Sequence, residues 1–260
     1  MTQTPRPAPL SRPLPRALLT LLPLGLAAVL GLLPTLPAML GPLIERTPGA
    51  PPMATLLAVT AAQLTVLVAV SVAAGAWAAP RAGFRSCLVD RDWAALRADA
   101  RAGLLPGLLT GVVIVALDRL TGPLLGEAWT RAAAGQERTV AVTVGGMLYG
   151  GIGEELQMRW ALVSVLTLGL WRVVQRRAAR PSRAVILTAV LVVAALFGIA
   201  HLGAVAALVP LTPAIVARTV LLNAVGGVVY GLHFTRRSLE SAMVAHAVTH
   251  VAMTALSLLP

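Results

Sequence analysis

Residues 150–159, which read GGIGEELQMR, place two glutamates and an arginine inside an apolar run, residues 139–174. An ionisable side chain at membrane depth costs roughly 2.5–3.5 kcal/mol on insertion scales, so we expect this group to face a protein interior and to have partners. On a helix Glu155 and Arg159 form an i,i+4 pair, whereas Glu154 points about 100° away. We therefore expect Glu155 and Arg159 to hold the site and Glu154 to be a free carboxylate. A purely structural ion pair is the alternative, and it leaves Glu154 unexplained.

The composition excludes an ordinary soluble domain. Hydrophobic residues make up 57% of the 260-residue chain and charged residues only 12%, which indicates a polytopic α-helical membrane protein. The net charge of +11 does not indicate a nucleic-acid partner, because the arginines lie between apolar runs and are not interleaved with aromatic residues. Cys87 is the only cysteine, so an intrachain disulfide is excluded, and a thiol nucleophile or a multi-cysteine metal site is disfavoured.

The apolar runs predict an all-α, polytopic transmembrane bundle of about seven spans, since a span needs about 20 residues. A Pro-rich segment, residues 1–16, precedes them and is predicted to be a disordered cytoplasmic tail. The run at 139–174 is too long for one perpendicular span. Either its glycines allow a break, with a short re-entrant piece before the spanning helix, or one long helix protrudes, and an eighth span is a further alternative. The seven runs are Ala17–Leu43, Met53–Ala79, Gly103–Leu125, Thr139–Val174, Ala184–Val209, Ala214–Phe234 and Leu239–Leu259.

The arginines predict the orientation of these spans. Positive residues are enriched in cytoplasmic loops, so the side that holds most of the arginines is predicted to be cytoplasmic, with the N-terminus inside and the C-terminus outside. The Arg-, Ala- and Leu-rich composition is typical of a GC-rich bacterial genome, so we expect a multi-pass protein of the bacterial inner or plasma membrane. The arginines of that side are Arg6, Arg12, Arg16, Arg81, Arg85, Arg91, Arg97, Arg101, Arg172, Arg176, Arg177, Arg180, Arg183, Arg236 and Arg237.

Three histidines in later runs are candidate partners of the glutamates. His201 is the only ionisable residue between positions 184 and 213, and its alternative role is structural, satisfied by a backbone carbonyl. His246 and His250 share one helical face at the spacing of paired metal ligands. They would otherwise donate hydrogen bonds to an oxyanion or belong to a face of small packing residues. Counted from the inside, Glu154 and His201 lie at roughly 27 Å depth but His246 at roughly 12 Å, so a shared site requires tilt, a break near Pro181 or a short protruding helix.

A carboxylate with several imidazoles is suited to activate a water molecule for attack on an amide bond. The carboxylate takes a proton directly or through metal-bound water, and imidazole N–H groups or a metal stabilise the tetrahedral oxyanion. The same groups would relay protons in a transporter or stabilise a non-enzymatic membrane scaffold. The candidate residues are Glu154, Glu155, Arg159, His201, His246 and His250.

The order of three motifs resembles the CPBP family, the CAAX-protease and bacteriocin-processing intramembrane endopeptidases, also called the Abi family. The motifs are Glu154-Glu155-x-x-x-Arg159, Phe197-x-x-x-His201 and the small-residue segment Ser238–His246, and the resemblance covers about Val140 to Met253. It implies an all-α catalytic core at residues 139–260. The transmembrane helices before it, residues 17–138, carry no recognisable signature.

The resemblance also implies roles for these residues. Glu154 would activate water with the help of His201, and Glu155 and Arg159 would support them. The substrate would be a membrane-associated peptide or protein cleaved near the bilayer, such as a leader peptide, rather than a prenylated CAAX chain.

One position departs from the family pattern. His246 would stabilise the oxyanion with the residue four positions later, where the family usually has Asn or Asp and this chain has His250. An imidazole also donates a hydrogen bond, so the oxyanion role is kept, but lost activity is an alternative. The histidines His201, His246 and His250 beside Glu154 would suit zinc better than the common pattern, so zinc is a candidate cofactor, although the motifs do not settle whether a metal is needed.

Overall fold

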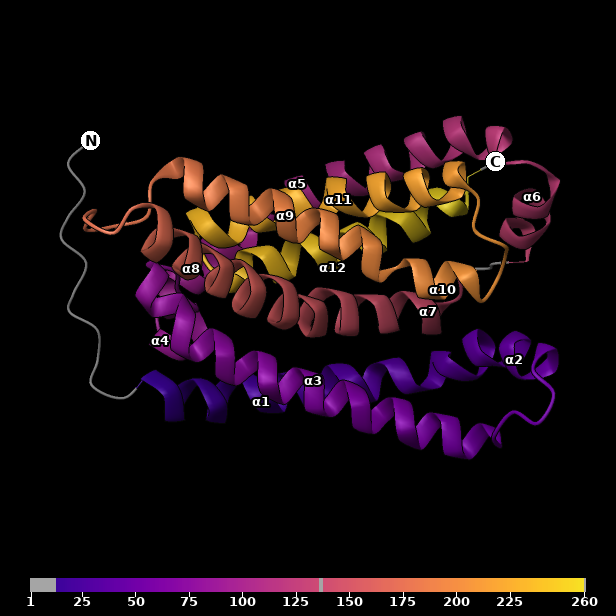
Figure 1. Cartoon of the computed structure of the whole chain (residues 1–260), viewed down its shortest axis with the longest axis horizontal. Coiled ribbons are helices and arrows are strands. Elements are labelled where there is room, and N and C mark those ends of the chain that lie inside the picture. The colour runs from indigo at the N-terminus through magenta and orange to yellow at the C-terminus, as the bar shows by residue number, and fades with distance from the viewer. Residues whose placement is uncertain (1–12, 136–137, 260) are drawn as a thin grey trace.

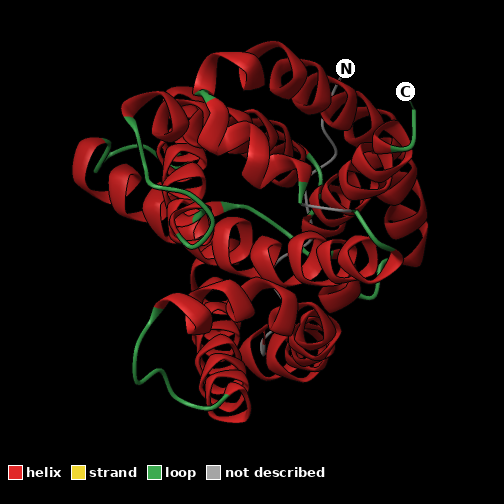
Figure 2. Cartoon of the chain, turned by 90° about the vertical axis from the view of Figure 1, so that its right-hand side faces the viewer, coloured by secondary structure: helices red, strands yellow, loops and turns green. Residues whose placement is uncertain are grey.

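The protein is described by a computed structural model over residues 13–135 and 138–259, which contain helices and loops but no strand (Figures 1 and 2). The predicted all-α fold is confirmed. Helices α1 (Pro13–Leu32), α2 (Leu36–Arg46) and α3 (Met53–Ala82) form one layer, and the other long helices lie on it (Figure 1). The remaining α-helices, long and short, are α4 (Cys87–Asp90), α5 (Trp93–Thr121), α6 (Glu127–Ala134), α7 (Val140–Gly145), α8 (Ser164–Val174), α9 (Arg183–Ala200), α10 (Leu202–Ala206), α11 (Pro213–Arg236) and α12 (Leu239–Ser257).

The N-terminal boundary differs from the prediction. Helix α1 begins at Pro13, so residues 13–16 of the predicted disordered tail are helical, while residues 1–12 lie outside the described residues. Proline is tolerated in a first turn because the N–H that it lacks has no helical partner there. The first apolar run then continues through a short 3₁₀ turn, η1 (Leu33–Thr35), into α2.

Five helices in the described ranges are long and apolar enough to cross a membrane, judged by length and composition. They correspond to five of the seven predicted runs, although the third begins at Trp93, ten residues before the predicted start, where the Asp92 side chain accepts a hydrogen bond from the Ala95 N–H at 3.0 Å. The fourth and seventh runs are helical but are not in this set. The total of seven spans and the cytoplasmic position of the N-terminus stay predictions. The five segments are Leu14–Gly41, Met53–Ala82, Trp93–Leu125, Arg183–Ala206 and Pro213–Arg236.

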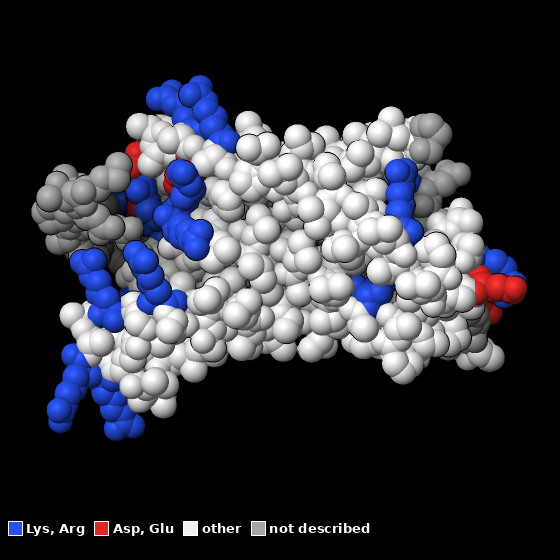
Figure 3. All heavy atoms as spheres, turned by 90° about the horizontal axis from the view of Figure 1, so that it is seen from above, with Lys and Arg blue, Asp and Glu red and all other residues white. Residues whose placement is uncertain are grey.

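Most of the arginine side chains in view gather at one end of the long axis, and a few lie toward the other end (Figure 3). That end holds α4 and the loop between α8 and α9 (Figure 1). The loops that the positive-inside pattern groups together thus lie at the same end of the bundle, which we call the arginine-rich end.

The fourth apolar run is one uninterrupted helical stretch, from α7 to α8. Its middle is π-helical, in the segments η3 (Gly146–Glu154) and η4 (Leu156–Val163), rather than the α-helix or re-entrant break predicted. Glycines weaken the α-helical preference of this stretch, and two of them make room for α12: a Cβ on Gly150 would lie 2.6 Å from His250 Nε2, and one on Gly151 would lie 2.9 Å from Ala247 Cβ. π-Helical turns often occur at functional sites.

Helix α12, which carries two of the candidate histidines, packs most extensively against α5. Gly103, Gly107 and Gly111 of α5 form a stripe at four-residue spacing that faces α12. A Cβ on Gly103 would lie 2.6 Å from the Ser241 carbonyl oxygen, and one on Gly107 would overlap the Ala245 carbonyl. Small residues permit such close backbone approach between membrane helices. This stripe fixes the position of the segment that leads into His246.

Gly107→Ala is expected to destabilise the protein and to lower activity. The added Cβ would overlap the carbonyl of Ala245, the residue before His246, and overpacking of this kind costs about 1–3 kcal/mol. Gly169→Ala on α8 is the matched control, because no atom lies within 4 Å of its added Cβ and alanine favours a helix over glycine. Thermal unfolding in detergent should therefore shift down for Gly107→Ala and stay level or rise for Gly169→Ala; equal shifts would contradict the packing argument.

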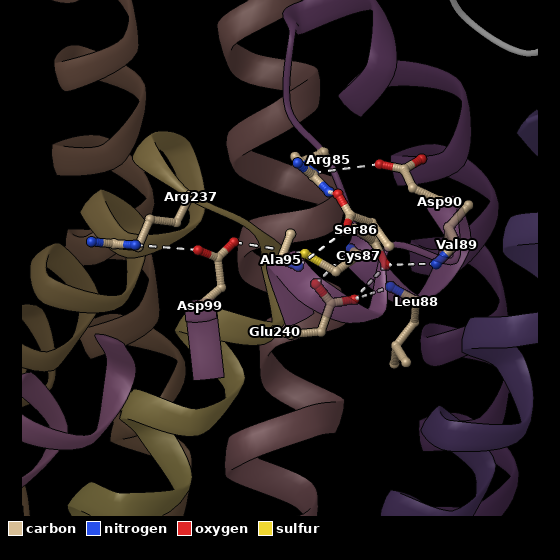
Figure 4. A network of polar contacts seen from close by, with 11 residues as sticks. Arg85, Ser86, Cys87, Leu88, Val89, Asp90, Ala95, Asp99, Arg237 and Glu240 are labelled. Carbon is tan, nitrogen blue, oxygen red and sulfur yellow. Dashed lines mark hydrogen bonds and ion pairs between the residues drawn. The ribbon is translucent and has the colours of Figure 1, made fainter. Parts of the chain in front are cut away.

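A buried carboxylate anchors the start of α12 to the loop between α3 and α5 (Figure 4). Glu240 accepts hydrogen bonds from the Ser86 hydroxyl at 2.5 Å and from the backbone N–H groups of Cys87 at 2.8 Å and Leu88 at 3.1 Å. These donors belong to the cap and first residues of α4, which suit a negative charge. Glu240 precedes His246 by six residues on the same helix, so this anchor helps to set the position of the imidazole.

Cys87 belongs to the same network (Figure 4). Burial, with a smaller contribution from the carboxylate of Glu240, raises the pKa of its thiol to about 11. The thiol therefore stays protonated near neutral pH, and it lies 3.6 Å from Asp99 Oδ2, to which it donates. A protonated, fully buried thiol is a poor nucleophile, in agreement with the sequence-based argument against cysteine chemistry.

Candidate active site

A cavity of about 310 Å³ lies where the π-helical stretch, α9, α11 and α12 meet. Four predicted site residues line it: Glu154, His201, His246 and His250. The other two, Glu155 and Arg159, are fully buried beside it and do not line it. The chain thus brings together residues that are up to 96 positions apart between Glu154 and His250.

Glu155 and Arg159 form the buried ion pair that their spacing predicts. Arg159 Nη1 donates to Glu155 Oε1 at 2.9 Å, and Nη2 donates to the Gly227 carbonyl at 3.2 Å. The guanidinium also lies over the rings of Phe197 at 4.9 Å and Tyr230 at 5.2 Å. Such contacts compensate part of the cost of burying the charge. The pair therefore ties the π-helical stretch to α9 and α11.

Glu155 also orients His246. The Nδ1 atom of His246 lies 2.8 Å from Glu155 Oε1, and because an ionised carboxylate only accepts, Nδ1 carries the proton. The imidazole is stacked on Tyr230, with ring centroids 4.3 Å apart and planes at 17°. Both contacts leave Nε2 of the neutral ring as a hydrogen-bond acceptor, and this atom lies 3.8 Å from Glu154 Oε2.

His201 is oriented in the same way. Its Nδ1 lies 2.8 Å from the carbonyl oxygen of Phe197, one turn earlier on α9, so Nδ1 is the donor and Nε2 of the neutral ring is an acceptor. Nε2 lies 3.9 Å from Glu154 Oε1. The backbone carbonyl of the structural alternative is therefore present, and the second nitrogen still faces the glutamate.

Glu154 differs from Glu155 in its environment. Its side chain is 19% exposed while that of Glu155 is 0% exposed, and it makes no hydrogen bond to a described residue. The imidazoles of His246 and His201 lie 3.8 and 3.9 Å from its carboxylate oxygens, beyond hydrogen-bond distance. The geometry matches the predicted division into a supporting and a free carboxylate.

His250 lies next to His246 but is less constrained. Their rings are stacked, with centroids 5.2 Å apart and planes at 18°, and the space is provided by Gly146 and Gly150 on the facing π-helical stretch. The described residues offer its ring nitrogens no hydrogen bond, so either nitrogen is free to carry the proton and donate into the cavity.

The depth difference between His246 and the other two residues is resolved by the hairpin of α8 and α9. The loop between these helices lies farther out at the arginine-rich end than the turn between α11 and α12 (Figure 1). His246 therefore reaches the depth of Glu154 with fewer residues of helix. The protruding hairpin is the explanation that the sequence had left open.

The arrangement of these donors bears on the predicted zinc site. Within the described ranges no group of three or more His, Cys, Asp or Glu side chains could hold a metal ion. His246 and His250 are nearly parallel and stacked, whereas a shared metal ion must lie in the plane of each ligating ring. In this arrangement the rings of His246 and His250 are not oriented toward one shared ion. Zinc binding stays a prediction.

Several cavity residues were not singled out by the sequence. Tyr230 and Tyr149 line the cavity, and the Tyr149 hydroxyl accepts from Gln157 Nε2 at 3.0 Å. Arg138 and Arg218 line it as well; Arg218 donates from Nε to Asp118 at 2.9 Å. The two tyrosines and Arg138 carry no spacing signal. Arg218 and Asn223, polar residues inside the sixth apolar run, could be expected from the sequence to line the cavity, and both do.

Comparison with known families bears on the same segment. Residues 136–252 match the family model described as Type II CAAX prenyl endopeptidase Rce1-like. No curated protein and no solved structure matches the chain. The matched segment contains every candidate residue of the cavity, from Glu154 to His250. Residues 136–252, which make up less than half of the chain, are therefore similar to the Rce1-like type II CAAX prenyl endopeptidases, consistent with the CPBP family of CAAX proteases.

Proposed function

We propose that this multi-pass membrane protein is an intramembrane endopeptidase that hydrolyses a peptide bond with water activated by Glu154. The Rce1-like match implies intramembrane protease activity. The observation that carries the mechanism is the convergence of a free carboxylate and two oriented imidazoles, Glu154 with His201 and His246, on one cavity. A purely structural ion pair would not need the second carboxylate.

The orientation of the imidazoles defines how a water would bind. Nε2 of His201 and Nε2 of His246 accept, as does Glu154, so a water between them donates one hydrogen to Glu154 and the other to an imidazole. Its oxygen lone pairs then face the peptide carbonyl carbon. Glu154 takes the first proton as the new C–O bond forms and the carbonyl electrons move to oxygen. When the C–N bond breaks, the same proton passes to the leaving nitrogen, which leaves a carboxylic acid and an amine.

The oxyanion needs a donor, and His250 supplies one. The N–H of the neutral His246 ring donates to Glu155, whereas the His250 ring makes no hydrogen bond to a described residue. Its N–H therefore donates to the oxyanion in the tetrahedral state, in the place where the family usually has Asn or Asp. The departure from the family pattern keeps the hydrogen-bond donor and is compatible with activity.

His250→Asn is expected to keep the hydrolysis rate within about tenfold, because an amide also donates a hydrogen bond. His250→Leu is expected to lower kcat by about 10²–10³-fold, the usual cost of removing one oxyanion donor. Steady-state cleavage of a membrane-anchored peptide in detergent micelles distinguishes the two. Equal rates for the Asn and Leu variants would show that His250 does not donate to the oxyanion.

The proposed substrate is a membrane-associated peptide or protein, and the proposed location is the bacterial cell membrane. Purified protein in proteoliposomes should cleave a membrane-anchored reporter peptide, with cleavage read by mass spectrometry. Proton flux in the same proteoliposomes tests the transporter alternative. Flux that depends on Glu154 without any cleavage would replace the peptidase proposal with the transporter.

A further inference from the structure

A second and larger cavity, of about 760 Å³, lies at the arginine-rich end, away from the candidate active site. It is formed by the first turns of α5, the last turns of α11 and the segments beside them. The residues that line it are Arg85, Ala95, Ala98, Asp99, Val229, Leu232, His233, Arg236 and Arg237. None of them lines the cavity that contains Glu154.

The lining of this second cavity carries more guanidinium groups than carboxylates. Three guanidinium groups line it against one carboxylate, Asp99. Both oxygens of Asp99 already accept hydrogen bonds: Oδ1 accepts from Arg237 at 3.2 Å and Oδ2 from the Cys87 thiol at 3.6 Å (Figure 4). Arg236 is exposed and forms no ion pair to a described residue. The cavity thus has positive charge left to bind an anion.

Arg85 lines the same cavity, and its guanidinium group contacts two carboxylates. Its Nη2 donates to Asp92 at 2.8 Å. Its Nε is buried and lies 3.5 Å from Asp90 Oδ2, to which it makes an ion pair without a hydrogen bond.

The remaining wall is apolar and lies where a membrane surface is expected. Val229 and Leu232 are half-buried on the face of α11 that also carries His233 and Arg236. Trp93, at the start of α5, is 57% exposed, as is typical of aromatic residues at a membrane–water boundary. A cationic rim beside an apolar wall at this depth matches a lipid, which has a phosphate head and an acyl chain, better than a free anion.

We propose that this cavity binds the phosphate headgroup of an anionic phospholipid, with Arg85, Arg236 and Arg237 on the phosphate. Val229 and Leu232 contact the glycerol and the upper acyl chain. Basic pockets between transmembrane helices on the cytoplasmic side are known to accept such headgroups. The binding is independent of the peptidase activity proposed for the other cavity.

The test is lipid binding to the full-length, detergent-purified protein, measured by native mass spectrometry. The probes are phosphatidylglycerol, phosphatidylcholine of the same acyl chains, and inorganic phosphate. The pocket variant is Arg236→Gln with Arg237→Gln. The matched control is Arg176→Gln with Arg177→Gln, which removes two exposed arginines from the loop after α8, outside this cavity.

We expect phosphatidylglycerol to bind the wild type and the control variant alike and the pocket variant roughly 10- to 30-fold more weakly, from the loss of two arginine contacts. Phosphatidylcholine should bind all three proteins weakly. Equal phosphatidylglycerol binding by the pocket and control variants would overturn the proposal, as would inorganic phosphate that binds as tightly as the lipid. The single variant Arg236→Gln removes an exposed side chain and covers the case in which the double variant does not fold; it should lose about 3- to 10-fold.

Discussion

Glu154→Gln is expected to lower kcat for peptide hydrolysis by about 10³-fold while KM changes little. The amide keeps the size of the carboxylate but cannot take a proton from water, and loss of a general base costs about 10²–10⁴-fold. Glu154 faces the imidazoles and makes no hydrogen bond that holds the fold together, so the variant should keep the unfolding temperature of the wild type. Cleavage of the reporter peptide and thermal unfolding are measured on the same preparation.

Two other glutamates serve as controls for this result. Glu127, on α6, is 90% exposed, and Glu127→Gln should leave cleavage unchanged. Glu155→Gln should lower both activity and stability, because Glu155 accepts from Arg159 and His246. If Glu154→Gln kept more than about a tenth of the wild-type rate, Glu154 would not be the base and the proposed mechanism would fail.

Arg159→Met is expected to destabilise the protein by about 3–5 kcal/mol, because it leaves the buried Glu155 carboxylate without its cation. Arg159 is 1% exposed and Glu155 0% exposed, so water cannot replace the lost partner. The same change removes the cation from the faces of Phe197 and Tyr230. Thermal unfolding in detergent should fall by about 6–20 °C.

The double variant Arg159→Met with Glu155→Gln separates the charge from the packing. It should recover part of the lost stability, because no unpaired charge remains buried. It should not recover activity, because His246 would lose the carboxylate that holds its proton on Nδ1. A double variant that is less stable than Arg159→Met would mean that packing, and not the unpaired carboxylate, causes the loss.

The helical class and the supporting ion pair could be predicted because both depend on local sequence. The apolar runs correspond to helices since every backbone donor in a bilayer needs an internal partner, and Glu155 and Arg159 are neighbours on any helical turn. The cap of α12 at Ser238, whose hydroxyl accepts from the Ser241 N–H at 3.4 Å, is equally local. The π-helical form of the fourth run was not predicted, because it depends on how closely α12 packs against Gly150 and Gly151.

The sequence by itself determined that this is an all-α membrane protein with a buried Glu155–Arg159 pair and a free Glu154, because periodicity and short spacing encode local contacts. Only the tertiary structure decided that His246 meets Glu154, that Glu155 orients its ring, and that Glu240 anchors the start of its helix. These contacts join residues 91 to 153 positions apart. Depth and rotation of each helix are set by packing against its neighbours, such as the glycine stripe of α5, and no single helix carries that information in its own pattern.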